Sequence, residues 1–139
     1  RRLARSLRVG DRVTFLGGRP HTELATCYQA ADLFLFASET ETQGLVLAEA
    51  AACGLPSVAV NAPGCDEVVR DGETGLLTKG DPTALAEAAI GILVDPARRG
   101  RMQLAARRLA ERDFDVRLQI DRTLAVYSEA RARLRGATR

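Results

Sequence analysis

At 139 residues the chain has the length of one domain and is long enough to bury a hydrophobic core. Apolar residues make up 46% and charged residues 27%, and the net charge of +2 gives no overall attraction to nucleic acid or to an anionic membrane surface. We expect no transmembrane segment, because no apolar run approaches the roughly 18 residues that a membrane span requires. Three cysteines without CxxC spacing predict free thiols in a cytoplasmic protein. The single histidine has no second imidazole to join it, so we predict no metal site.

The first thirty residues are expected to supply a helix end, a strand and a helix. The chain starts without methionine in what resembles the last turns of a helix stopped by Gly10, as expected for a piece of a longer protein. Alternating, β-branched residues over 12–16 predict a strand. Thr22 has the side chain of a helix N-cap and is followed by apolar residues at helical spacing, so we expect a helix over 22–31.

Two apolar strands flank an unusual helix. The continuous apolar run 33–36 predicts a strand covered on both faces, and residues 57–60 predict another strand. Between them, residues 44–53 predict a helix closed by Gly54, and Glu49 has the only polar side chain in it. A helix that is apolar all round is a buried helix, so the Glu49 carboxylate must face either a partner, such as an arginine, or a polar ligand at a cleft.

The second half of the chain predicts a short helix over 67–69, a tight turn at 71–72, a strand over 76–78 and then helices only. Three aspartates are the predicted N-caps of the last helices: Asp81, Asp95 and Asp115. Strands that alternate with helices predict the α/β class, with a Rossmann-like parallel sheet, helices on both faces and an all-helical C-terminal third.

The loop 38–43 and the helix after it form the candidate site, because ligands of open parallel sheets bind beyond the carboxyl ends of strands. Gly44 lets a ligand approach the backbone closely. The free N–H groups at residues 45–46 and the helix dipole would hold an anion such as a diphosphate. Glu49 would accept hydrogen bonds from the two hydroxyls of a ribose, and Glu41 would reach the other side of the phosphates.

The segment from Glu41 to Glu49 closely resembles the E-x7-E motif of retaining, nucleotide-sugar-dependent glycosyltransferases of the group 1 type, which have the two-domain GT-B fold. Further segments resemble the same family in the same order: residues 15–17, 31–36, 54–59, 67–77 and 80–82. The resemblance therefore covers nearly the whole chain.

The resemblance implies roles by position. Glu41 would be the catalytic residue that contacts the transferred sugar, and Glu49 would bind the ribose hydroxyls of the donor. The other implied donor-binding residues are the backbone of Thr42, Gln43, Gly44 and Leu45, at the turn that holds sugar hydroxyls and the β-phosphate, and Gly17 to Arg19, beside the nucleobase. Such enzymes need no metal and no cofactor; the substrate is a nucleotide diphosphate sugar, here expected to be UDP-linked.

The chain also departs from the family. Thr42-Gln43 stands where Gly-Phe is usual, a form associated with some glycolipid glucosyltransferases. Nothing before Arg12 matches the strand and the Arg/Lys loop with which the family's domain begins, and the acceptor-binding N-terminal domain is missing. We therefore expect residues 1–139 to be a single, incomplete nucleotide-sugar-binding domain that is inactive alone. Its acceptor is undefined (lipid, polysaccharide or small molecule), and peripheral membrane association of the full-length protein is compatible with the sequence.

Several alternatives stay open at this point. The chain could be a noncatalytic module of the same fold that binds a nucleotide or a protein partner. Glu67 is either a cleft residue or a first-turn acid favoured by a helix dipole. Asp113-Phe114-Asp115 mimics a metal-binding DxD motif, but its place before a helix predicts an N-cap. The arginine-rich last nine residues predict a solvated helix end; without an aromatic platform or basic stripe, they do not predict nucleic-acid binding.

Overall fold

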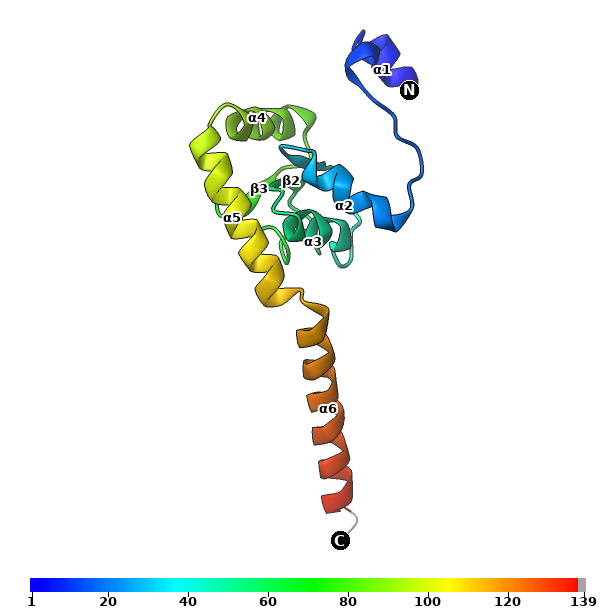
Figure 1. Ribbon diagram of the computed structural model, residues 1–139, viewed down its shortest axis with the longest axis vertical. Coiled ribbons are helices and arrows are strands. Elements are labelled where there is room, and N and C mark those ends of the chain that lie inside the picture. The colour runs from blue at the N-terminus through cyan, green and yellow to red at the C-terminus, as the bar shows by residue number, and fades with distance from the viewer. Residues whose placement is uncertain (138–139) are drawn as a thin grey trace.

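The computed structural model describes residues 1–137, and their side chains as far as residue 134; the end of the arginine-rich tail lies outside the described residues. The elements follow one another in the order α1 (Arg2–Ser6), the 3-10 helix η1 (Gly10–Arg12), α2 (His21–Gln29), β1 (Phe34–Phe36), α3 (Leu45–Ala52), β2 (Ser57–Val60), β3 (Gly75–Thr78), α4 (Pro82–Leu93), α5 (Pro96–Asp113) and α6 (Val116–Ala137) (Figure 1).

The sheet of the described residues has three parallel strands in the order β1-β2-β3. Successive residues of the buried central strand β2 face opposite layers of helices. Val58 packs in one cluster with Ile92 of α4 and Met102 of α5, whereas Ala59 packs in another with Leu47 of α3. Helices therefore cover both faces of the sheet, and the predicted α/β class with a parallel sheet is confirmed.

Helix α3 lies between the sheet and α5 and is buried on one side only. Small side chains let α3 and α5 approach closely, as in the cluster of Ala51, Ala106 and Ala110. The opposite side of α3 is open: Leu45 is 60% exposed and Glu49 is only part-buried. The expectation of a helix buried all round was therefore wrong, because Leu45 and Glu49 lie one helical turn apart on a face that meets a cavity and not the core.

The predicted strand over residues 12–16 was wrong. Val13 has extended backbone angles, but the segment pairs with no strand among the described residues. Phe15 and Leu16 are about half exposed, and the guanidinium of Arg1 lies 5.4 Å from the centroid of the Phe15 ring. A strand requires a neighbour for its ladder of hydrogen bonds, and the described part of the chain offers this segment none, whatever its β propensity.

Three other expectations need correction. Leu35 of β1 is 50% exposed, because the helices that cover the second face of the sheet pack over β2 and β3 and leave β1 open on that side. Helix α2 begins at His21 and ends at Gln29, and Thr22 does not cap it. The residues around Glu67 form successive turns after Gly64 in place of a short helix.

The three predicted aspartate caps are confirmed. Asp81 accepts a hydrogen bond from the N–H of Ala84, and the other two accept from N–H groups in the first turns of their helices: Asp95 from Arg98 and Asp115 from Arg117. The strands β2 and β3 and the tight turn at Gly72 also match their predictions.

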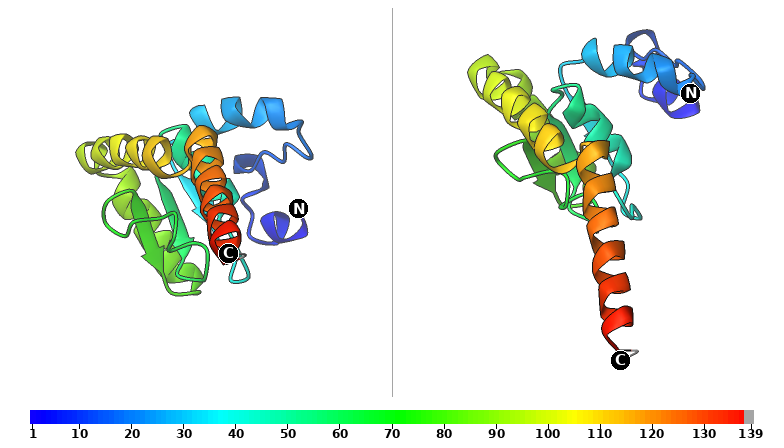
Figure 2. Two further views of the ribbon diagram at one scale, coloured as in Figure 1. Left: turned by 90° about the horizontal axis from the view of Figure 1, so that it is seen from below. Right: turned by 60° about the horizontal axis from the view of Figure 1, so that its bottom comes forward.

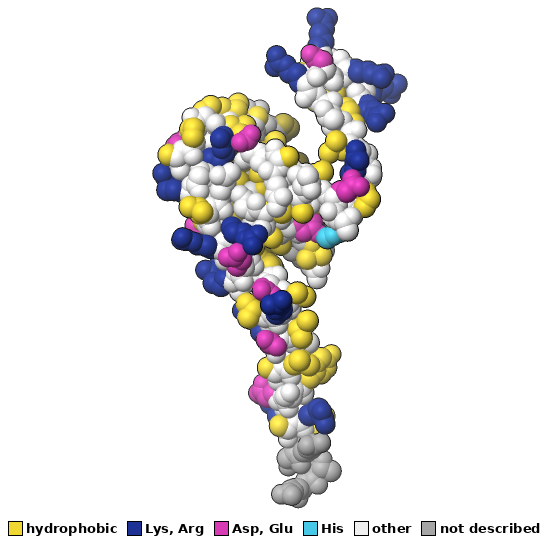
Figure 3. Space-filling model, viewed as in Figure 1, with side chains coloured by type: hydrophobic (Ala, Val, Ile, Leu, Met, Phe, Trp, Pro, Cys, Tyr) yellow, Lys and Arg dark blue, Asp and Glu magenta, His cyan; other side chains and the backbone are white. Residues whose placement is uncertain are grey.

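The all-helical C-terminal third is confirmed as well. Helix α6 leaves the sheet-and-helix body and extends away from it, as Figure 1 and the right view of Figure 2 show. Hydrophobic side chains lie along its exposed length (Figure 3). Within the part of the chain that the structure describes, no helix is both long and apolar enough to cross a membrane.

Candidate functional site

The turn between β1 and α3 packs against the turn that follows β2 through two glycines, one from each turn. Gly44 is the N-cap of α3 and has a left-handed backbone with φ of 63°. A Cβ on Gly44 would lie 2.5 Å from the carbonyl oxygen of Gly64, which itself has φ of 81°. The close approach expected at Gly44 is thus made by the chain's own backbone, and it fixes the path of the loop that carries Glu41.

The Glu41 carboxylate is held by the loop that follows it. Its Oε1 accepts three backbone hydrogen bonds, from the N–H groups of Thr42 (2.9 Å), Gln43 (3.1 Å) and Gly44 (3.2 Å). These bonds lower the pKa of Glu41 below its ordinary value, and the bond from Gln43 has the largest effect. The Glu41 carboxylate is therefore ionised at neutral pH. Oε2 bonds to no atom of the described residues and is free to accept a hydrogen bond from a ligand.

The first turn of α3 offers the free donors that the sequence predicts. Among the described residues, no acceptor bonds to the N–H groups of Leu45 and Val46. The helix dipole places partial positive charge at the same end. These two N–H groups are available to an anion, whereas those of Thr42, Gln43 and Gly44 are already taken by Glu41; their predicted role toward the donor stays a prediction.

Both oxygens of the Glu49 carboxylate have partners on α2. The hydroxyl of Tyr28 donates a hydrogen bond of 3.1 Å to Oε2, and Nε2 of His21 lies 3.1 Å from Oε1. No arginine of the described chain pairs with Glu49, so the buried-salt-bridge alternative is not what the structure shows. The Glu49 side chain keeps 32% of its surface exposed, enough for a ligand to reach it.

Tyr28 is itself fixed by aromatic packing. Its ring meets Phe34 of β1 edge-on at a centroid distance of 5.6 Å, and Phe34 stacks on Phe36 at 6.0 Å. Burial, followed by the hydrogen bond to Glu49 and its charge, raises the pKa of Tyr28 to about 12. The hydroxyl therefore remains a proton donor to the carboxylate at physiological pH.

A cavity of about 640 Å³ lies against the open face of α3. From α3 and its loop it is lined by Gln43, Leu45, Ala48, Glu49 and Ala52; from elsewhere in the chain it is lined by Glu67, Ala110, Phe114, Val116 and Gln119. The structure thus brings three predicted donor-binding residues, Gln43, Leu45 and Glu49, to one cavity. Glu67 lines the same cavity and begins no helix, so it is not a first-turn acid; a contact with the donor stays a prediction.

Glu49 also lines a second hollow of about 340 Å³ on the α2 side, together with His21 and Tyr28. The carboxylate therefore stands between two cavities. The predicted nucleobase contacts Gly17 and Arg19 line neither of them, and Arg19 instead pairs with Glu23 at 3.4 Å.

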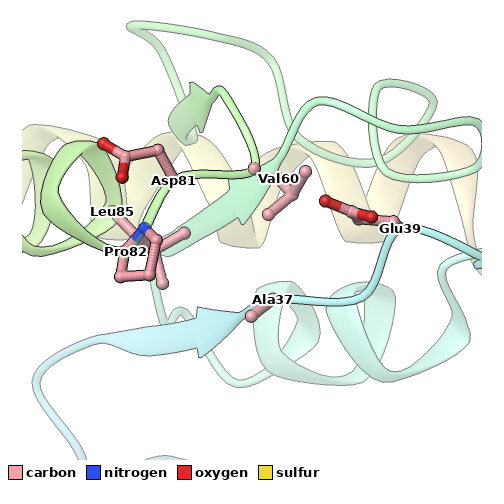
Figure 4. A pocket seen from close by; sticks show the side chains of 7 residues that line it. Ala37, Glu39, Val60, Asp81, Pro82 and Leu85 are labelled. Atoms are coloured by element: carbon pink, nitrogen blue, oxygen red, sulfur yellow. The ribbon is translucent and has the colours of Figure 1, made fainter.

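A third cavity, of about 280 Å³, lies at the carboxyl ends of β1 and β2 (Figure 4). Figure 4 shows Glu39 on one side and the start of α4, with Asp81 and Pro82, on the other. Asp81 is committed to its helix cap, and a Cβ on Gly80 would collide with the Glu39 carboxylate. None of the predicted site residues lines this cavity, so it is not the candidate site.

The sequence did not indicate that His21 and Tyr28 belong to the site. Their spacing places them two turns apart on one face of a predicted helix, but nothing in the sequence says what that face meets. Within the described residues, no group of three or more His, Cys, Asp or Glu side chains is placed to hold a metal ion. Asp113 pairs with Arg112 at 2.8 Å, and Asp115 caps α6, so the DxD-like string has structural roles.

A parallel sheet covered by helices on both faces, with a cavity beside the first turn of the helix that follows β1, is the arrangement of ligand-binding α/β proteins. The chain belongs to the family described as "Glycosyl transferases group 1", whose sequence profile matches residues 1–109. The fold is that of the GT-B glycosyltransferases, since the sucrose-phosphate synthase of Thermosynechococcus elongatus is similar with a TM-score of 0.88 and 36% identity, over 94% of this chain and 33% of that protein.

Two further proteins are similar to this chain over most of its length. D-inositol 3-phosphate glycosyltransferase 1 of Catenulispora acidiphila is 41% identical over 130 residues, which are 93% of this chain and 31% of the relative. The Anabaena protein HepE, solved in complex with UDP, is 32% identical with a TM-score of 0.82, over 90% of this chain and 35% of HepE. The chain spans about a third of the length of the curated relatives that it matches.

Proposed function

We propose that this chain is the nucleotide-sugar-binding domain of a retaining glycosyltransferase. The full-length enzyme would transfer a sugar from a nucleotide diphosphate sugar, UDP-linked, to an acceptor. The observation that carries the proposal is the position of Glu49, an accessible carboxylate that lines one cavity together with Leu45, the first residue of α3. HepE, which is 32% identical, has been solved with UDP and with UDP-glucose, which supports a UDP-linked donor.

Two parts of the donor, the ribose and the diphosphate, would have counterparts in this site. A ribose presents two neighbouring hydroxyl donors, and the Glu49 carboxylate is an acceptor with lone pairs to spare. The diphosphate would lie at the N-terminus of α3, where the N–H groups of Leu45 and Val46 and the helix dipole favour negative charge. The same groups would stabilise the leaving diphosphate, whose charge develops as the sugar departs.

Glu41 would position the transferred sugar. Its Oε1 is fixed by three N–H groups, whereas its Oε2 is free to accept a hydrogen bond from a sugar hydroxyl. This arrangement suits an orienting residue better than a covalent nucleophile. We therefore propose a front-face displacement assisted by the leaving phosphate, with net retention at the anomeric carbon and no bound metal.

A second candidate function, a noncatalytic nucleotide- or partner-binding module, is favoured by one observation. Among the described residues, the cavity beside Glu49 is lined by two acids, Glu49 and Glu67, and by no lysine or arginine. Cationic groups as well as N–H donors stabilise a diphosphate, so the enzyme would have to supply them from residues that do not line this cavity.

The acceptor, whether lipid, polysaccharide or small molecule, would be bound by another part of the full-length enzyme. We place the protein in the cytoplasm, because its cysteines are free thiols: Cys27, Cys53 and Cys65.

The proposal is tested by incubating the full-length protein with UDP-glucose and following the reaction by NMR. D-inositol 3-phosphate is the first acceptor to try, because relatives that are about 40% identical are named for it. We expect release of UDP and a glucosyl product with the α configuration of the donor. A β product would contradict retention. Binding of UDP without transfer to any acceptor or to water would favour the noncatalytic module.

A further inference from the structure

We propose that Tyr28 is a positioning residue of the donor site, which holds the Glu49 carboxylate in the orientation that receives the ribose hydroxyls. The inference rests on the proposed function, because it assigns the ribose to Glu49. It adds a residue that lies outside the glutamate motif and on a different helix.

The first support is the geometry between α2 and α3. The Tyr28 hydroxyl lies 3.1 Å from Oε2 of Glu49, and Nε2 of His21 lies 3.1 Å from Oε1. His21 and Tyr28 are two helical turns apart, so they project from the same face of α2. That face holds the two oxygens of one carboxylate from two directions.

The second support is that Tyr28, unlike His21, is a rigid partner. The Tyr28 ring is part-buried and packs edge-on against Phe34 of β1. The His21 side chain is 83% exposed, and its contact with Glu49 competes with water. The same strand β1 leads into the loop of Glu41, so one element supports both glutamates of the site.

The third support is the number of acceptor positions. Each carboxylate oxygen can accept two hydrogen bonds, and α2 occupies one on each oxygen. One position on each oxygen is left, which matches the two hydroxyl donors of a ribose. A free glutamate side chain would lose rotamer freedom when it binds, and a partner that fixes it beforehand removes that cost.

The test compares two ligands in the full-length protein: UDP, and 2′,3′-dideoxy-UDP, which lacks both hydroxyls. Their affinity ratio isolates the contribution of the ribose hydroxyls and is insensitive to a general loss of folding. Titration calorimetry would measure it for the parent and for Glu49→Gln, Tyr28→Phe and the double variant. Tyr127→Phe is the matched control, because it removes the same hydroxyl from an exposed position on α6.

The preference for UDP is the ratio of its affinity to that of 2′,3′-dideoxy-UDP. We expect Glu49→Gln to lower this ratio by about tenfold or more. Tyr28→Phe should lower it by about threefold to tenfold, the double variant should resemble Glu49→Gln alone, and Tyr127→Phe should leave it unchanged. If Glu49→Gln lowers the ratio but Tyr28→Phe does not, the proposed function stands and the role of Tyr28 is refuted. If the parent shows no preference for UDP, the ribose assignment fails, and the role of Tyr28 fails with it.

Discussion

The carbonyl oxygen of Gly64 lies 2.5 Å from the position that a Cβ on Gly44 would occupy. Two turns from different parts of the chain thus meet backbone to backbone at the N-terminus of α3. Both glycines have left-handed backbone angles that side chains disfavour. The contact sets the place of the Glu41 loop relative to the free N–H groups of α3.

This contact predicts that Gly44→Ala destabilises the protein by about 2 to 4 kcal/mol, from left-handed strain together with overlap against Gly64. The free energy of unfolding from denaturant titration measures the effect. Gly91→Ala is the control, since Gly91 lies inside α4, where an added methyl group would meet open space among the described residues. That change should be neutral or stabilising by about 0.5 to 1 kcal/mol. Equal unfolding midpoints for the two variants would refute the close approach.

The helix caps give a second prediction. Asp95 accepts a 2.8 Å hydrogen bond from the N–H of Arg98, so Asp95→Ala should lower the free energy of unfolding by about 1 kcal/mol. Thr22 lies within the first turn of α2 and caps nothing, so Thr22→Ala should change stability by less than about 0.5 kcal/mol. A larger loss at Thr22 than at Asp95 would contradict a start of α2 at His21.

Glu41 makes stability depend on pH in the acid range. Its pKa in the folded protein is lowered by the three N–H hydrogen bonds, so the ionised carboxylate stabilises the folded state above its ordinary pKa of 4.5. This stabilisation is lost as the pH falls through the folded-state pKa below 4.5. The difference in the free energy of unfolding between the parent and Glu41→Gln should therefore be largest near neutral pH and should decrease in acid.

Glu39→Gln is the control for this measurement, because Glu39 lies in the same loop and accepts no hydrogen bond from the described residues. Thermal unfolding at a series of pH values would follow all three proteins. A gap between the parent and Glu41→Gln that stays constant down to strongly acidic pH would mean that the N–H groups do not hold the carboxylate.

The hydroxyl of Tyr28 should lose its proton at a higher pH than an ordinary tyrosine. Its pKa of about 12 predicts that tyrosinate absorbance from Tyr28, obtained as the difference between the parent and Tyr28→Phe, appears near pH 12. Because the folded pKa lies above the ordinary value of 10, this tyrosine stabilises the fold below pH 10, and the stabilisation is lost as the pH rises toward 12. Glu49→Gln should lower the titration midpoint, since the hydrogen bond to Glu49 and its charge contribute to the shift. A midpoint that does not move would mean that the two side chains are not in contact.

The sequence was most informative where a residue broke a local pattern. Glu49 stands out in an otherwise apolar helix, and the structure places it at a cavity with two partners. The aspartates before prolines at 81–82 and 95–96 likewise identified two helix starts, because a cap and its helix are neighbours in the chain.

The sequence-based predictions failed where the structure of a segment depends on contacts with residues far away in the sequence. Residues 12–16 have the alternation of a strand but no pairing partner in the described chain, and the run around Leu35 has cover on only one face. The contact of Tyr28 with Glu49 could not be predicted either, because it depends on how α2 docks on α3. Tertiary packing decides these cases, and local patterns do not record it.

The most direct test of the account is a titration of the full-length protein with UDP, beside Glu49→Gln and Glu87→Gln. Glu87 lies exposed on α4, so the second variant makes the same chemical change away from the site. We predict saturable binding of UDP by the parent and by Glu87→Gln, weakened about tenfold or more in Glu49→Gln through the loss of charge-assisted hydrogen bonds. Equal affinity of Glu49→Gln and the parent would contradict the assignment of this cavity as the nucleotide-sugar site.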